Sequence, residues 1–496
     1  MTNAIRHTDE QLKIIEISKR MQSGEILKIN ACAGSGKTTM LKEVALANPD
    51  KTFLYLAFNK SIVEESKNKF PKNVKLQTVH SLAYQAVIAP RKAKVVSSYN
   101  VFDFMKYLPF KDYQEAQIFQ ADLTHFLNSA LPLSETSDDV RMWFKLVEIG
   151  EIPYTHNLYL KSYQLMTMQQ ENLSEKYDFV LLDEAQDTNK VTLSIFLNNS
   201  CKKILVGDVF QNIYGFRETI NALSNEVLKA DYNCNLSFSF RCPQNILDKA
   251  YFFLNKYALD GQKPLKMKSG VVDNGDEQDT RILITRLNAS IVKIIYDTLT
   301  DSARNMRYSL LKNPSDLLES SIAVYWFLKN RRDKIPYSYA WIKKFSDESE
   351  LYSYADESGD QELKSSIDNA ENYDIRLFDI LDEAKRIYKR KDEFDKYLTN
   401  AHLSKGLEFS EVSLHNDFLP LKAMQNVFIN TVSPTEKKKL FLAIIQEKNL
   451  YYVAMTRAKK KLIDFSENHK EFLSIINSIK TTAHSSHRGL GVFANA

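Results

Sequence analysis

Short apolar runs recur along the first half of the chain, and each ends in small or polar residues. Such runs are typical of strands buried in a parallel sheet. They occupy residues 26–30, 52–58, 179–182 and 203–206, whereas residues 74–78 alternate like a half-buried strand. Between these runs the apolar positions follow a helical period. The pattern therefore predicts an α/β fold in which strands and helices alternate.

Two stretches interrupt this alternation. Residues 89–165 are helical by periodicity and rich in aromatic side chains, and residues 301–392 are mostly helical. Acidic residues crowd the second stretch between Ser346 and Asp374, which is typical of a solvated face or a loose linker and would repel DNA. Beyond Arg241 a second core begins, and residues 281–286 are predicted to form one of its strands.

The chain is therefore expected to contain two cores, each interrupted by an insertion. The predicted parts are a first core at 1–88 and 166–238, its helical insertion at 89–165, a second core at 239–300 and 393–480, its short, partly acidic helical insertion at 301–392, and a flexible tail at 481–496. The length of 496 residues accommodates them, because domains average ~150 residues.

Composition adds few constraints. With 44% hydrophobic and 26% charged residues, the chain has the composition of an ordinary globular protein. The net charge of +4 does not by itself indicate that the protein binds nucleic acid, so any DNA-binding groove has to be locally basic. The cysteines lack Cys-x-x-Cys spacing, which argues against a zinc or iron–sulfur site and favours a reducing, cytoplasmic location. The N-terminus is not typical of a signal peptide, and no apolar run approaches the ~18 residues of a membrane span.

The clearest chemical motif follows the first strand, where a loop of small residues opens a helix with Lys37 and Thr38. Gly34 and Gly36 let the backbone approach a polyphosphate, and the loop amides and helix N-terminus attract its charge. Lys37 can reach the β- and γ-phosphates, and Thr38 can place its hydroxyl on Mg²⁺. The usual first glycine is Ala31 here, so the alternative is a turn of small residues that precedes a helix by chance.

A pair of carboxylates follows the strand at residues 179–182. At the carboxyl end of a strand beside a P-loop, Asp183 is placed to hold Mg²⁺ through water, and Glu184 to orient and deprotonate the attacking water. Gln211, in the loop after the next strand, can sense a γ-phosphate.

Residues near the N-terminus leave two interpretations open. Thr8 and Gln11 have the spacing of a capping box at the start of a helix. The amide of Gln11 can also pair with a donor and an acceptor on an adenine edge.

Small polar and aromatic residues at successive strand ends can line a groove for a single strand of nucleic acid. Thr78 and His80 follow one strand in this way, although His80 taken alone is more typical of a core or capping histidine. Tyr214 and Phe216 lie in the loop after Gln211, where aromatic rings can stack on bases.

Nine blocks, in order, resemble the motifs of superfamily 1 helicases of the UvrD/Rep/PcrA type. They lie at residues 8–11, 31–38, 57–60, 78–81, 183–187, 206–217, 236–241, 398–409 and 447–458. The motif sequences Ala-Phe-Asn-Lys, His-Ser-Leu-Ala-Tyr and Ser-Phe-Arg are similar to those of the branch that contains the F-box DNA helicases, although no F-box segment is evident.

The resemblance implies two RecA-like parallel-sheet P-loop domains in tandem, each with a mostly helical insertion. It implies an ATP- and Mg²⁺-dependent DNA helicase or translocase that moves 3′ to 5′ along single-stranded DNA and unwinds tailed duplexes, in DNA repair, recombination or defence against foreign DNA. The alternative is a DNA-stimulated ATPase that strips or signals to a partner protein, such as a nuclease or recombination protein, with little strand separation. The complete motif set favours the first, and the short second insertion favours the second.

The resemblance also assigns roles to residues. The implied catalytic residues are Lys37, Glu184, Gln211, Arg241 and, as an arginine finger, Arg457. The implied ATP contacts are Gln11, Ala33, Gly34, Ser35, Gly36, Lys37, Thr38, Thr39, Phe240 and Glu408, with Thr38 and Asp183 on the metal. The implied DNA contacts are Asn59, Thr78, His80, Tyr214, Phe216, His402 and Ser404. Because these residues come from both cores, ATP is expected to draw the cores together and hydrolysis to release them.

Overall fold

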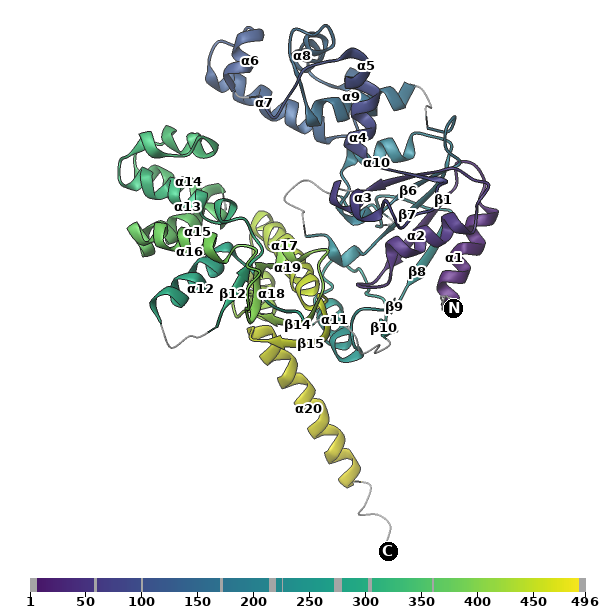
Figure 1. Ribbon diagram of the computed structural model, residues 1–496, viewed down its shortest axis with the longest axis vertical. Coiled ribbons are helices and arrows are strands. Elements are labelled where there is room, and N and C mark those ends of the chain that lie inside the picture. The colour runs from purple at the N-terminus through teal and green to yellow at the C-terminus, as the bar shows by residue number, and fades with distance from the viewer. Residues whose placement is uncertain are drawn as a thin grey trace, which may run out of the picture. The chain divides into compact units, whose positions relative to one another are not determined.

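The chain forms two units, Met1–Phe240 and Arg241–Ala496, each of which is built on a parallel sheet (Figure 1). The computed structural model describes residues 7–57, 60–99, 101–169, 173–213, 220–224, 226–271, 279–301, 306–358 and 361–489. None of the helices in these described ranges has the length and apolar character that crossing a membrane requires.

The first sheet has the strand order β3-β2-β6-β7-β1-β8, and all neighbouring strands run parallel. Its strands are β1 Ile26–Ala31, β2 Phe53–Ala57, β3 Val74–Thr78, β6 Phe179–Leu182, β7 Lys202–Gly207 and β8 Tyr232–Leu236. The carboxyl ends of parallel strands meet at one edge of the sheet. The loops after β1, β6 and β7, which carry the predicted motifs, are therefore brought together from distant parts of the sequence.

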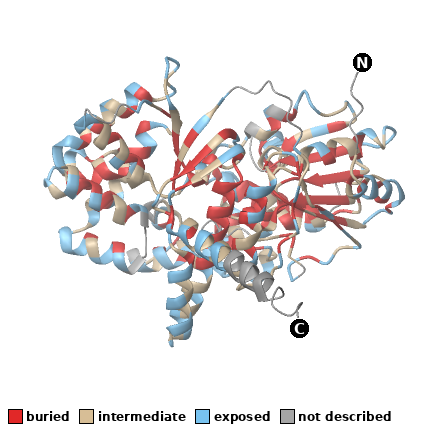
Figure 2. Ribbon diagram, turned by 90° about the horizontal axis from the view of Figure 1, so that it is seen from below, coloured by how far each residue is buried: buried red, intermediate tan, exposed pale blue. Residues whose placement is uncertain are grey.

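Helices cover both faces of this sheet, and the strands between them are buried (Figure 2). Along β2, Phe53 and Tyr55 point to the face covered by α1 and α2, whereas Leu54 and Leu56 point to the opposite face. The helices outside the insertion are α1 Asp9–Arg20, α2 Lys37–Leu46, α3 Lys60–Ser66, α4 Val79–Ala83, which continues into the π-helical turn Tyr84–Ile88, and α10 Lys190–Leu197.

The helical insertion lies between the π-helical turn and β6. It contains α5 Ala89–Arg91, α6 Val101–Tyr107, α7 Tyr113–Asn128, α8 Asp138–Glu148 and α9 His156–Gln169, with the short strands β4 Val95–Val96 and β5 Tyr154–Thr155. Trp143 and Phe104 are buried within it, in the same apolar cluster as Leu54 and Leu56 of β2. The insertion therefore shares one core with a face of the sheet, which fixes it to the strands.

The second unit has a parallel sheet in the order β12-β13-β11-β14-β15. Its strands are β11 Arg281–Thr285, β12 Tyr308–Leu310, β13 Lys396–Asn400, β14 Phe409–Leu414 and β15 Ala458–Asp464. The predicted α/β class with two parallel sheets is confirmed. Strand β12 lies in the range predicted for the second insertion, and β15 begins at the last residue of the motif block at 447–458.

Helices of the second unit fall into an insertion and a set around the sheet. The insertion packs α13 Pro314–Leu328, α14 Glu348–Ser358, α15 Gln361–Tyr373 and α16 Leu377–Ile387 into one apolar cluster with α12 Asn288–Thr300. The others are α11 Gln244–Lys256, α17 Ala401–Ser404, α18 Leu421–Asn430, α19 Pro434–Met455 and α20 Glu467–Gly489. Helix α20 continues into the range predicted as a flexible tail, and residues 490–496 lie outside the described part.

Candidate functional site

The loop between β1 and α2 has the backbone of a phosphate-binding turn. Gly34 and Gly36 adopt positive φ angles of 72° and 77°, which other residues enter only at a steric cost. Gly36 caps α2, so the free N–H groups of that helix face the loop. The hydroxyl of Ser35 is buried and has no hydrogen-bond partner among the described residues. A buried donor inside such a loop is suited to an anionic ligand.

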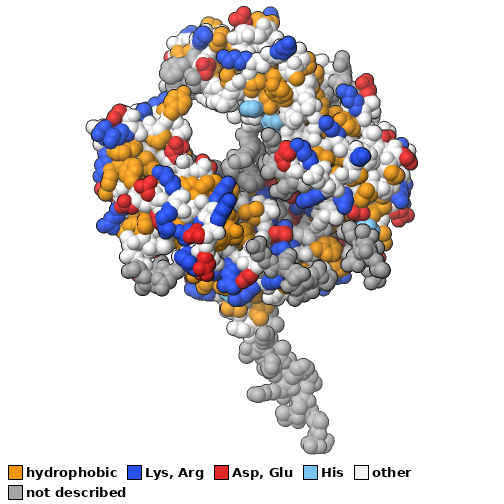
Figure 3. All heavy atoms as spheres, viewed as in Figure 1, with side chains coloured by type: hydrophobic (Ala, Val, Ile, Leu, Met, Phe, Trp, Pro, Cys, Tyr) orange, Lys and Arg blue, Asp and Glu red, His pale blue; other side chains and the backbone are white. Residues whose placement is uncertain are grey.

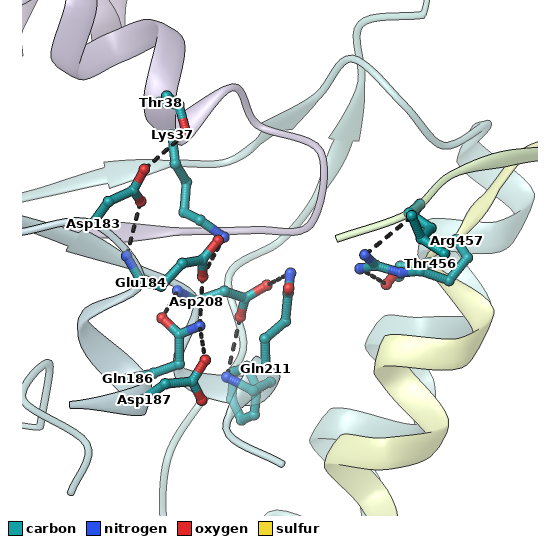
Figure 4. A network of polar contacts seen from close by, with 12 residues as sticks. Lys37, Thr38, Asp183, Glu184, Gln186, Asp187, Asp208, Gln211, Thr456 and Arg457 are labelled. Atoms are coloured by element: carbon teal, nitrogen blue, oxygen red, sulfur yellow. Dashed lines mark hydrogen bonds and ion pairs between the residues drawn. The ribbon is translucent and has the colours of Figure 1, made fainter. Parts of the chain in front are cut away.

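Lys37 and Thr38 at the start of α2 face the carboxylates at the end of β6 (Figure 4). The Nζ of Lys37 lies 3.2 Å from Oε2 of Glu184, and the hydroxyl of Thr38 donates a 2.8 Å hydrogen bond to Oδ2 of Asp183. Burial lowers the pKa of Lys37, but the surrounding carboxylates, Glu184 first among them, outweigh it and hold that pKa above its ordinary value. Lys37 is therefore a fixed cation.

Asp183 has a further partner that the sequence analysis did not identify. The buried hydroxyl of Tyr55, on β2, donates a 2.7 Å hydrogen bond to the same oxygen of Asp183 that Thr38 contacts. Burial and the charge of Glu184 raise the pKa of Asp183, while Lys37 and the two hydroxyl donors oppose that rise. Tyr55 therefore helps to keep this carboxylate ionised, which metal binding requires.

Glu184 is held in an unusual backbone conformation. Its φ of 52° lies in the left-handed region, and its N–H donates a 2.8 Å hydrogen bond to Oδ1 of Asp183. Such a conformation costs a non-glycine residue ~1–3 kcal/mol and is concentrated at functional sites. The turn directs the Glu184 carboxylate toward Lys37.

Gln186 joins two of the motif loops, and the sequence analysis did not single it out. Its amide Nε2 donates to Oε2 of Glu184 at 2.6 Å, and its Oε1 accepts the N–H of Asp208 at 3.1 Å. A Cβ on Gly207 would lie 2.3 Å from Oε1 of Gln186, so any larger residue would displace that side chain. The buried Gln186 side chain thus ties the Glu184 carboxylate to the end of β7.

Gln211 is also held at the end of β7, by a hydrogen bond to Asp208. The buried carboxylate of Asp208 accepts the Nε2 of Gln211 at 2.7 Å and the N–H of Phe210 at 3.1 Å. The predicted γ-phosphate sensor therefore lies in the network that holds Glu184 (Figure 4).

These residues fit magnesium and a nucleoside triphosphate. Thr38 and Asp183 present adjacent oxygens, which Mg²⁺ prefers. Lys37 supplies a positive charge, and the loop supplies the unpaired hydroxyl of Ser35. Of the other residues predicted at the nucleotide, Ala33 in the loop is buried and Thr39 on α2 is exposed.

Two further residues predicted at the nucleotide, Gln11 and Phe240, are each held by a hydrogen bond to another residue. The capping box of α1 is present: Gln11 accepts the Thr8 N–H at 2.9 Å through its Oε1. The role of Gln11 toward adenine stays a prediction. Phe240 donates its N–H to the carbonyl of Gly34 at 2.9 Å, while its ring is 47% exposed. An open ring fixed to the phosphate loop is suited to stacking on a base.

The predicted DNA contacts of the first unit are only partly described. Thr78 ends β3 and caps α4 by accepting the Ser81 N–H at 3.1 Å, and His80 follows on α4. Both lie at the same sheet edge as the P-loop. Asn59, Tyr214 and Phe216 lie outside the described residues. Lysine and arginine side chains are interspersed with acidic ones on the face drawn in Figure 3.

In the second unit, Arg241 is paired with Glu408. The guanidinium Nε lies 2.9 Å from Oε2 of Glu408, and Lys459 lies 3.4 Å from Oε1. Although burial alone would raise the pKa of Glu408, these two cations hold it below its ordinary range. Glu408 is thus a fixed anion, and its predicted contact with a nucleotide stays a prediction.

Arg457, predicted as an arginine finger, is 1% exposed. Its guanidinium donates to the carbonyls of Val453 at 2.8 Å and Leu407 at 3.4 Å. These bonds tie the end of α19 to the start of β14. Its predicted role in catalysis stays a prediction.

Two predicted DNA contacts lie on α17. Ser404 is buried and donates its hydroxyl to the carbonyl of Ala401 at 2.7 Å. A serine hydroxyl on a helix commonly finds its acceptor in a backbone carbonyl three or four residues earlier. His402 is partly exposed. Their contacts with DNA stay predictions.

Comparison with known families covers both units. Residues 152–230 match the UvrD/REP helicase N-terminal domain, and residues 329–468 match the UvrD-like helicase C-terminal domain. Each unit of the chain therefore contains a match to a UvrD-like helicase domain. The two matches, in this order, fit the tandem RecA-like architecture of the two sheets.

The curated relatives of this chain have names that fit these domain matches. It is 27% identical to the F-box DNA helicase protein 1 of Schizosaccharomyces pombe and 26% identical to the F-box DNA helicase 1 of Gallus gallus, in each case over 92% of its length. It covers 57% and 49% of those two proteins, so it spans about half the length of these relatives. A 113-residue stretch is 34% identical to a probable DNA helicase II homolog of Mycoplasma genitalium.

Proposed function

We propose that this chain is an ATP-driven motor that moves 3′ to 5′ along single-stranded DNA and separates the strands of tailed duplexes. The observation that carries the proposal is the junction of Lys37, Glu184 and Asp183 under a phosphate-binding loop. The UvrD-like domain matches and the names of the relatives support DNA as the substrate along which the chain moves.

Each residue of the junction has a chemical task. Lys37 and the loop amides bind the phosphates, and Glu184 orients the attacking water and accepts its proton. Gln186 and Lys37 hold that carboxylate in place from two sides. Thr38 and Asp183 would hold Mg²⁺, which when bound neutralises charge on the phosphates.

The experiment is a measurement of ATP hydrolysis with and without single-stranded DNA, beside strand separation on 3′-tailed, 5′-tailed and blunt duplexes. We expect DNA to stimulate hydrolysis and only the 3′-tailed duplex to be separated. The Lys37→Ala variant is the control and should do neither. Hydrolysis that DNA does not stimulate would contradict the proposal, and stimulation without separation of any duplex would favour a translocase that acts on a bound partner protein.

A further inference from the structure

A cluster of four rings joins the core of the first unit to its helical insertion. The ring of Tyr159, on α9, lies at the centre, with centroids 6.1 Å from His80, 6.0 Å from Tyr84 and 5.6 Å from His156. The Nδ1 of His156 also lies 3.0 Å from the Tyr159 hydroxyl. His80 and Tyr84 come from the segment after β3, whereas His156 opens α9.

The cluster is buried at its centre and open at its rim. Tyr159 is buried, but Tyr84 is 45% exposed as a residue, His156 is exposed and His80 is partly exposed. The three outer rings stand at 70° to 85° to the ring of Tyr159, so none of them is stacked on it. A cluster that served only to join two parts of the fold would gain most by burying these rings.

The position of the cluster separates it from the nucleotide site. It follows β3, which lies four strand spacings from β1 across the sheet. At ~4.8 Å for each spacing, that is ~19 Å from the strand that leads to the phosphate loop. Because the sheet is parallel, both sites lie along the same edge.

We infer that Tyr84, His80 and His156 form a stacking site for a base of single-stranded DNA, positioned by Tyr159. Aromatic rings bind every base through its face and therefore tolerate any sequence. Burial and the neighbouring His156 lower the pKa of His80, which keeps its ring neutral near pH 7 and suited to stacking. The site rests on the proposed function and extends the DNA track from the core onto the insertion.

The direct test is photo-cross-linking of the wild-type chain to oligo(dT) that carries 5-iodouracil, followed by mass spectrometry of the adducts. We expect adducts at Tyr84 or within residues 156–159, because Thr78 and His80 are already implied DNA contacts. No substitution is needed, so folding does not confound the result. Adducts only elsewhere in the chain would overturn the inference and leave the proposed function intact.

Substitutions give a second, quantitative test by fluorescence anisotropy with the same oligonucleotide. His156→Ala and Tyr84→Ala should each weaken binding about fivefold or more, the lower range for one stacked base. His125→Ala, an exposed histidine on α7 of the same insertion, is the matched control and should bind like wild type. Binding of both test variants within twofold of wild type would contradict the inference. If wild type bound no DNA at all, both this inference and the proposed function would be wrong.

Discussion

The hydroxyl of Tyr55 and the carboxylate of Asp183 form a 2.7 Å hydrogen bond between neighbouring strands of the first sheet. The bond lies where Asp183 also contacts Thr38, at the residues that would hold Mg²⁺. It matters because burial and Glu184 push the pKa of Asp183 upward, and a hydrogen-bond donor opposes that shift.

Removal of this donor should weaken metal binding. We expect Tyr55→Phe to raise the Mg²⁺ concentration needed for half-maximal ATP hydrolysis about tenfold, since a hydrogen bond to a charged group contributes ~1.5–3 kcal/mol. The pKa of Asp183 should rise further in the variant, and only the ionised carboxylate binds metal. When the pH is lowered, the variant should therefore lose activity at a higher pH than wild type does. Binding of a fluorescent ADP at varied Mg²⁺ provides a readout without turnover. Tyr352→Phe, which loses a hydrogen bond to Glu371 on the second insertion, is the control. An unchanged Mg²⁺ requirement in Tyr55→Phe would rule out this role.

Glu184→Gln should separate binding from hydrolysis. We expect the variant to bind ATP and Mg²⁺ but to turn over at least ~100-fold more slowly, the usual contribution of a general base. The amide introduced by this substitution keeps an oxygen that can accept from Gln186, so the loop should keep its shape. Steady-state hydrolysis and nucleotide binding are the measurements, with the exposed Glu348→Gln on α14 as control. Turnover close to wild type would remove Glu184 from the role of base.

Gly207 and Gln186 should be coupled in stability. Gly207→Ala places a Cβ 2.3 Å from Oε1 of Gln186, and we expect a loss of ~1–3 kcal/mol in the free energy of unfolding, as is usual for overpacking. Gln186→Ala removes that contact, so the double variant should be less destabilised than the sum of the single variants. Urea unfolding of the three variants measures the coupling, and strict additivity would mean that Gln186 is not the obstacle.

Arg457→Ala should affect both turnover and stability. If Arg457 acts as an arginine finger, turnover should fall about 10³-fold with little change in nucleotide affinity, because its charge matters most in the transition state. The carbonyls of Val453 and Leu407 would also lose the guanidinium as a donor, although Val453 keeps the hydroxyl of Thr456, and we expect this loss to cost ~1–3 kcal/mol. Hydrolysis should therefore be measured well below the melting transition of the variant. A loss confined to stability, with normal turnover, would make Arg457 a structural residue only.

The sequence by itself determined the parts of the site that depend on local patterns. An apolar run followed by Gly34, Gly36 and Lys37 indicates a strand, a turn and a helix, because the run is suited to a buried strand and glycine permits the positive φ angles that the turn needs. The position of the carboxylates after β6 was also predictable, because they follow a buried apolar run and parallel strands end at a common edge of the sheet.

The tertiary structure alone decided which side chains support that site. Tyr55 reaches Asp183 only because β2 lies next to β6, a strand order that no local pattern encodes. Strands β12 and β15 escaped prediction because their stability comes from pairing with neighbours. Lysines on β15 are typical of a protected sheet edge. The burial of Arg457 and Ser404 likewise follows from packing around them, because a side chain is enclosed by residues far away in the sequence.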